Sequence, residues 1–183
     1  MGSLLAWARG HITPDNIKNR LDFTKITETL VALSKMVDSP EKVRTGGVFA
    51  FAYLPKDAPE QSMLWSVSFG SPGANIIGNG YHAVEKINRT RNRRTEGHND
   101  STSTQSADET NPDKSLRTYG GCVVFRGDHD GDEIYISISG GPPRVDEAMS
   151  YATGLACGFN PLTSMETPLV EEAMEMLKGV FTD

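Results

Sequence analysis

The chain has 183 residues, a hydrophobic fraction of 37% and a formal net charge of −6. This length is sufficient for one domain with a hydrophobic core. The negative charge argues against nucleic acid or an anionic membrane as the main partner. No apolar run reaches the length of a membrane span, and the N-terminal apolar stretch 4–7 is too short for a signal peptide. We therefore expect one domain over residues 1–183 in a soluble, cytoplasmic protein.

Amphipathic helices are predicted near both ends of the chain. Thr13 is a suitable N-cap with Pro14 after it, and the range 22–37 has an apolar stripe at helical spacing that Pro40 ends. A final helix is predicted from Pro168 onward. The apolar residues of these two helices are Ile26, Leu30, Leu33 and Val37, then Leu169, Ala173, Met176 and Leu177.

Two strands and a helix are predicted in the first half of the chain. The aromatic-rich run 46–54 is typical of a central strand, and the run 62–69 alternates between apolar and small polar side chains. A short polar connection joins the two runs, which predicts an antiparallel hairpin. After a glycine-rich segment, a helix is expected from about Tyr81 to Arg93.

The end of this helix is basic, and the segment after it is polar. We interpret the arginines as a solvated helix end rather than as a nucleic-acid site. Residues 95–116 contain almost no apolar side chain, so they cannot bury enough surface to offset their ordering entropy. The sequence therefore predicts a flexible polar insertion that the core can lose. The basic cluster consists of Arg89, Arg91, Arg93 and Arg94.

Residues 119–159 predict a second hairpin followed by a helix. The run 122–125 is β-prone, Asp130-Gly131 is a favoured turn, and 133–139 alternates with isoleucine at every second position. This alternation predicts that one face of the strand lies on a core. Two glycines and two prolines end the strand, and 145–156 has helical apolar spacing.

The same residues carry a resemblance to a known family. A glycine pair precedes a strand, a DGDEI turn follows, the next strand ends in ISISGG, and the helix contains DEAMSYATGLA. This order resembles the C-terminal half of the GlcG/HbpS-like family, also called the haem-degrading domain. The resemblance covers 119–159 by sequence and part of the preceding chain by order of elements only. These motifs indicate a fold rather than a chemistry.

The order of elements predicts an α+β fold with antiparallel strands in two pairs. The resemblance implies a profilin-like or PAS-like sheet of four or five strands with helices packed on it. It also implies a homo-oligomer. The polar insertion at about 95–116 departs from the family, in which this region is shorter.

The candidate ligand-binding residues are His82 and Tyr81. The resemblance implies that the helix after the first hairpin faces a pocket, and His82 is the histidine on that helix. Haem or a related tetrapyrrole is the ligand that the family suggests, with His82 as a ligand of the iron. The alternative interpretation places His82 as a partly exposed residue at the start of a helix, and Tyr81 as a core aromatic.

Other catalytic or metal signatures are weak. The segment 128–132 (DHDGD) resembles a calcium loop, but its glycine is fourth and Ser139 occupies the twelfth position where glutamate is required. We interpret it as a hairpin turn and predict no metal site. No catalytic residue can be named. Cys122 and Cys157 lie in apolar surroundings typical of buried, reduced thiols.

Three classes of function are compatible with these features. The first is a small-molecule-binding protein, with haem as the ligand that the resemblance suggests. The second is a small cofactor-independent enzyme, an isomerase or cyclase, that acts on an apolar metabolite between sheet and helices. The third is an interaction scaffold without a ligand. We expect the first and leave open whether the protein is an enzyme.

Overall fold

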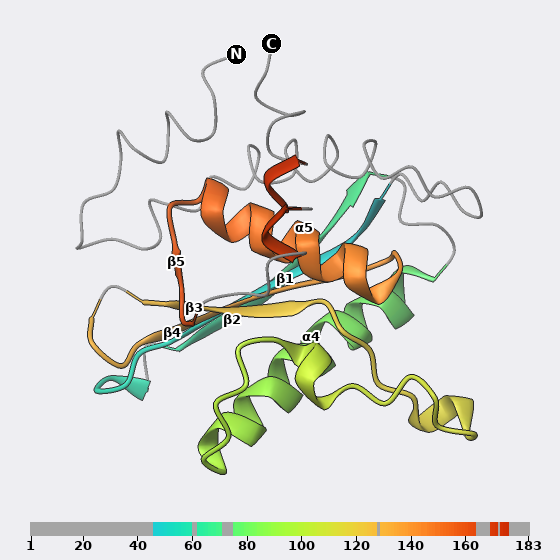
Figure 1. Cartoon of the computed structure of the whole chain (residues 1–183), viewed down its shortest axis with the longest axis horizontal. Helices are drawn as coiled ribbons and strands as arrows, with labels where there is room; N and C mark the ends of the chain where they lie inside the picture. Colours follow the sequence, from blue (N-terminus) through green and yellow to red (C-terminus); the bar gives the residue numbers. More distant parts are fainter. Residues whose placement is uncertain are drawn as a thin grey trace.

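A computed structural model describes residues 46–59, 62–70, 75–127, 129–163, 169–171 and 173–175. Within these ranges the fold is α+β, with a five-stranded antiparallel sheet in the order β2-β1-β4-β3-β5. Figure 1 shows α4 on one side of the sheet and α5 on the other. The predicted α+β class and antiparallel sheet are confirmed at this level.

The first hairpin consists of β1 (Gly46–Leu54) and β2 (Met63–Gly70). The two strands pair antiparallel, with Gly46 opposite Gly70 and Tyr53 opposite Met63. This confirms the predicted hairpin to within one residue at each strand end. β1 is central because it also pairs with β4, and its first seven residues are buried.

Helix α4 (Ile76–Thr95) begins five residues before the predicted start at Tyr81. The glycines at 78 and 80 suggested a loop, since glycine lowers helix stability by about 1 kcal/mol relative to alanine. Packing offsets this penalty, because Asn79 is buried and its N–H bonds the Asn75 carbonyl at 2.9 Å.

The second hairpin and its helix follow the prediction closely. β3 (Cys122–Arg126) and β4 (Glu133–Ser139) pair antiparallel, and α5 (Pro143–Ala156) has proline in its first turn. A two-residue strand, β5 (Asn160–Pro161), pairs with the end of β3.

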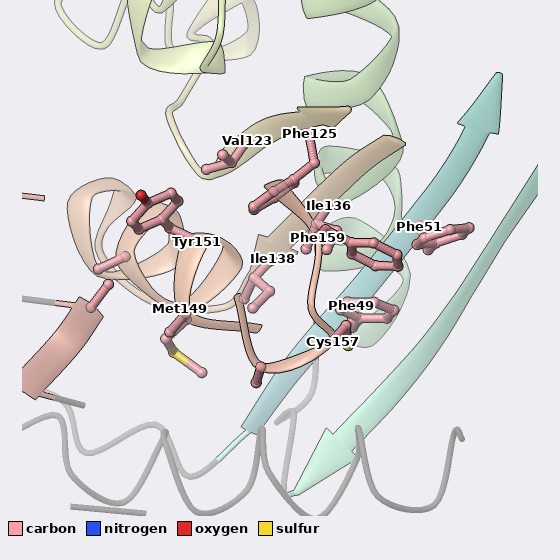
Figure 2. Close-up of a cluster of buried hydrophobic side chains, with 14 of the residues drawn as sticks. Phe49, Phe51, Val123, Phe125, Ile136, Ile138, Met149, Tyr151, Cys157 and Phe159 are labelled. Atoms are coloured by element: carbon pink, nitrogen blue, oxygen red, sulfur yellow. The ribbon is translucent and has the colours of Figure 1, made fainter. Parts of the chain in front are cut away.

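Both faces of β4 are buried, whereas the alternation predicted one face on a core. Ile134, Ile136 and Ile138 join the core beneath α5, part of which is shown in Figure 2. Tyr135 lies on the opposite face with Ala83 and Ile87 of α4. The alternation identifies the isoleucine face of β4 as a core face. The other face carries Tyr135 and serines, and it becomes buried only because α4 covers it.

The polar segment 95–116 contains a buried anchor, which corrects the prediction that it has none. Residues 100–103 are buried, and Thr102 forms an antiparallel bridge with Val123. The Ser101 carbonyl accepts from the Val124 N–H at 2.9 Å, so this part continues the sheet edge. Two short 3-10 helices, η2 (Ser103–Ser106) and η3 (Lys114–Leu116), follow.

The predicted helices at 13–21 and 22–37 lie outside the described residues. The C-terminal helix is described in two short ranges, 169–171 and 173–175, both helical. Leu169 and Ala173 belong to the core beneath α5, as their spacing predicted.

The two covered faces of β4 lead to a first prediction. Ile136→Asp and Tyr135→Asp should both prevent stable folding, because each buries a carboxylate without a partner. Tyr135→Phe should lower the free energy of unfolding by only about 1 kcal/mol, since it removes one hydrogen bond, to Glu133. Urea unfolding measures all three. A stable Tyr135→Asp variant would contradict the packing of α4 on this face.

The anchor at 100–103 leads to a second prediction. Replacing residues 108–117, most of which are exposed, with a short glycine-serine linker should leave the melting temperature within a few degrees of wild type. Asp100→Ala should lower the melting temperature clearly more than the linker does, because it removes a buried carboxylate that accepts from Arg93. Thermal unfolding followed by circular dichroism compares the two. An equal effect of both changes would argue against the anchor.

Candidate functional site

A groove runs between α4 and the edge strand β2. Helix α4 packs on β1 and β4, with few contacts to β2. On the face that α4 covers, Ala50 of β1 is paired with Ser66 of β2. Ala50 is completely buried, whereas Ser66 is exposed, because the helix stops short of the edge strand. The uncovered edge of the sheet and the side of α4 therefore form the two walls.

The groove has a volume of about 690 Å³ and is open to solvent. It is lined by Ser66, by eight residues of α4 from Gly80 to Arg93, and by Glu96, the C-cap of that helix. The lining residues of α4 recur every three to four positions, so they form one stripe along the helix. Tyr81 and Val84 lie toward its N-terminal end, and Asn88 and Asn92 in the middle. Its volume lies within the usual range for small-molecule sites.

The guanidinium of Arg89 lines the groove but is committed to the protein. It donates to Glu85 at 2.5 Å, to the Tyr119 carbonyl at 2.6 Å and to the Ser106 hydroxyl at 3.1 Å. A longer bond reaches the Ser103 carbonyl at 3.4 Å. Arg89 therefore ties η2 and the start of the second hairpin to α4.

The neighbouring arginines are committed in the same way. Arg93 donates to both carboxylate oxygens of Asp100, and Arg94 donates to Glu133 at 2.5 Å and to the Asp100 carbonyl at 3.0 Å. These bonds raise the pKa of both guanidinium groups above the usual value, although partial burial of Arg94 opposes the rise. The interpretation of a solvated basic helix end is wrong for Arg89, Arg93 and Arg94.

Tyr81 and His82 occupy different surroundings. Tyr81 is 68% exposed and lines the groove. The His82 ring is half-buried and meets the rings of Tyr81 and Tyr119 edge-on, with centroids 5.6 and 5.8 Å away. His82 is not among the lining residues of this groove. The structure therefore places the two candidates side by side but brings only Tyr81 to the groove.

A buried ion pair joins the two layers of the fold. Lys86 of α4 and Asp146 of α5 are 1% and 3% exposed, and their charged atoms are 3.2 Å apart. The Lys86 ammonium also donates to the Ile138 carbonyl at 2.7 Å, and the Gly141 N–H donates to Asp146 at 2.9 Å. Gly121, with φ of +124°, makes room, because a Cβ there would lie 2.6 Å from the Lys86 nitrogen.

Glu147, beside Asp146, holds the polar segment from the other side. It accepts hydrogen bonds from the Thr104 hydroxyl and from the Gly121 backbone. Burial raises the pKa of Glu147, and these bonds oppose the rise. The first turn of α5 therefore fixes α4 through one carboxylate and η2 through the next.

Burial shifts the titration of two further groups. Burial raises the pKa of Asp146 to about 6, although Lys86 and the Gly141 N–H favour its charged form. Burial also raises the pKa of the Cys122 thiol to about 12, and this free cysteine is buried, as predicted. Neither group lines the groove, so neither is placed for acid-base chemistry there.

Residues 129–132 lie in the turn between β3 and β4, where the Asp132 N–H donates to the His129 carbonyl at 3.1 Å. Asp132 is buried and accepts from the Tyr53 hydroxyl at 2.7 Å and from the Lys56 N–H at 2.9 Å. Its carboxylate thus fixes the first hairpin to the second, and these bonds lower its pKa against the effect of burial.

Across the described ranges, no three His, Cys, Asp or Glu side chains meet in a group that could hold a metal ion. No helix in that part of the chain is long and apolar enough to cross a membrane.

Sequence reasoning missed the buried charges. Lys86 lay in a helix whose other faces are polar, and nothing in the local pattern distinguished it from an exposed lysine. Asp146 and Glu147 lie near the start of a helix, where exposed carboxylates are favoured by the helix dipole, so their positions gave no sign of burial. The available signal was a pair of glycines at 120–121, before β3, and a second pair at 140–141, after β4. Such pairs indicate that backbone segments approach closely at this end of the second hairpin.

No protein-family model matches the chain, and no curated protein or solved structure matches it either.

The buried pair leads to a third prediction, on pH. An Asp146 pKa raised above the unfolded value means that this residue stabilises the fold most below about pH 4, and that its contribution falls as pH rises through about 6. The wild-type free energy of unfolding, minus that of Asp146→Asn, should therefore decrease by about 1–3 kcal/mol between pH 4 and pH 7. Urea unfolding across this range measures the difference. If the stability difference between wild type and Asp146→Asn instead increases with pH, the pKa of Asp146 is lowered in the folded state and the prediction is wrong.

Proposed function

We propose that this chain is a ligand-binding protein whose small-molecule ligand lies in the groove between α4 and β2. The observation that carries the proposal is an exposed aromatic ring, Tyr81, at one end of an open groove of about 690 Å³. An exposed aromatic ring offers a large apolar face with a polar hydroxyl at its edge, which suits a binding contact.

The proposal extends the resemblance to the GlcG/HbpS-like family. The strand order β2-β1-β4-β3, with one helix on each face, supports a profilin-like or PAS-like layout. In such a layout, the helix after the first hairpin carries the ligand contacts, and α4 is that helix. We further propose that the protein is cytoplasmic and self-associates, as the sequence and the resemblance imply.

Haem fits the described residues poorly. An axial histidine should face an apolar cavity, whereas His82 meets two tyrosine rings and does not line the groove. The groove is open and its middle is lined by amide and charged side chains. A Soret band on titration with haem that is lost in His82→Ala and kept in His98→Ala would restore haem as the ligand.

The enzyme alternative finds less support in this geometry. An acid-base catalyst must reach its substrate. Burial raises the pKa of Asp146 to about 6, but this residue is 3% exposed and both of its oxygens are engaged. The scaffold alternative would apply if no ligand bound in the groove.

Substitution of Tyr81 provides the fourth prediction. Saturation-transfer NMR against a library of fragment-sized molecules should identify binders, and Tyr81→Ala should weaken them about tenfold, because a lost aromatic contact is worth roughly 1.4 kcal/mol. Leu116→Ala is the matched control, since Leu116 is 63% exposed and lies outside the groove. Fragments that bind both variants equally would remove the groove as the site.

A further inference from the structure

The groove's hydrogen-bonding groups divide into committed and uncommitted ones. Both guanidinium groups that line it already bond protein carboxylates, Arg89 to Glu85 and Arg93 to Asp100. An anion in the groove would have to displace one of these carboxylates. The charges therefore do not select an anionic ligand.

The groups available to a ligand in the middle of the groove are neutral. Asn88 and Asn92 are exposed, and Ser66 faces them from β2. Each asparagine amide presents two N–H donors and one carbonyl acceptor on a short side chain. A ligand that bonds both the N–H donors and the carbonyl acceptors of these amides must carry acceptors and donors in alternation, as a peptide backbone does.

The spacing of the two amides matches an extended peptide. Asn88 and Asn92 are four residues apart on one face of α4, which corresponds to about 6 Å along the helix axis. Alternate residues of an extended chain are about 6.6–6.8 Å apart. The two amides can therefore bond the backbone of two peptide residues that are two positions apart. The side chain of the peptide residue between them then points away from the amides.

The length and the ends of the groove agree with this occupant. The lining stripe from Gly80 to Glu96 spans about 24 Å of helix, enough for roughly seven extended residues. Tyr81 and Val84 supply an apolar contact at one end, and the exposed carboxylate of Glu96 lies at the other.

We propose that the ligand of the groove is an extended peptide, held through its backbone by Asn88 and Asn92, with an apolar side chain on Tyr81. This inference rests on the proposed function, since it uses the same groove, and it widens the class of ligand from a small molecule to a short extended peptide. The partner is a chain segment recognised mainly by its backbone, with one apolar residue and a basic residue toward Glu96 setting its direction.

The test uses random dodecapeptides displayed on phage and selected on the full chain. The enriched peptide is then synthesised with a fluorescent label, and its affinity is measured by anisotropy. The double variant Asn88→Ala and Asn92→Ala should raise the Kd about tenfold or more, since it removes several backbone bonds. Alanine is a better helix former than asparagine, so α4 should persist. Arg91→Ala, exposed on α4 outside the groove, should leave the Kd within about twofold.

A second comparison tests recognition of the backbone. The same peptide with N-methyl groups on alternate residues should bind wild type as weakly as the plain peptide binds the double variant. Failure of any peptide to enrich, or equal affinity for wild type and the double variant, would overturn the inference. If fragments still bind in a Tyr81-dependent manner in that case, the proposed function stands and only the peptide assignment fails. Loss of both peptide binding and Tyr81-dependent fragment binding would contradict the proposed function as well.

Discussion

The buried ion pair between Lys86 and Asp146 is the interaction on which the arrangement of this fold depends. The sheet separates α4 from α5 over most of its area, as Figure 1 shows. The two helices meet through this pair at the end of the sheet, where β3 begins at Cys122. Removing a charge pair from water is expensive, and the penalty is repaid only when additional hydrogen bonds satisfy both partners. The Ile138 carbonyl and the Gly141 N–H supply such bonds and offset part of the penalty, although burial still leaves the pKa of Asp146 raised.

This constraint positions the polar segment and the groove. Because Lys86 fixes the inner face of α4 above β1 and β4, the outer stripe of the helix faces the uncovered strand β2. Arg89 and Arg93 then extend from that stripe to η2 and Asp100. The same arginines form one wall of the groove and hold the segment 100–106.

The contrast between committed and uncommitted groups is the basis for the functional proposal. Many charged groups around α4 satisfy one another, so they stabilise the fold rather than attract a charged ligand. The groups left for recognition are an aromatic ring, two amides and a hydroxyl, with the Glu96 carboxylate at one end of the groove. Such neutral groups give specificity through the geometry of hydrogen bonds, since a ligand that leaves them unpaired loses their hydration without compensation.

The sequence by itself determined the two hairpins, the helix α5 and the α+β class. Each of these follows from local periodicity: alternation in 133–139, apolar density in 46–54, and helical spacing with proline at the start of α5. The start of α4 was missed because glycine lowers helical propensity, whereas packing of Asn79 outweighs that loss.

The tertiary structure alone decided which polar residues are interior. Lys86 and Asp146 look solvated in sequence, and each becomes buried because the other, in a distant part of the chain, neutralises it. Asp100 is buried beside Arg93, which lies only seven residues before it. Burial of a charge depends on the partner's position in space, and local sequence carries no signal for a partner sixty residues away, as for Lys86 and Asp146. The groove is likewise a product of the tertiary structure, because it exists only where α4 covers β1 and β4 and leaves β2 uncovered.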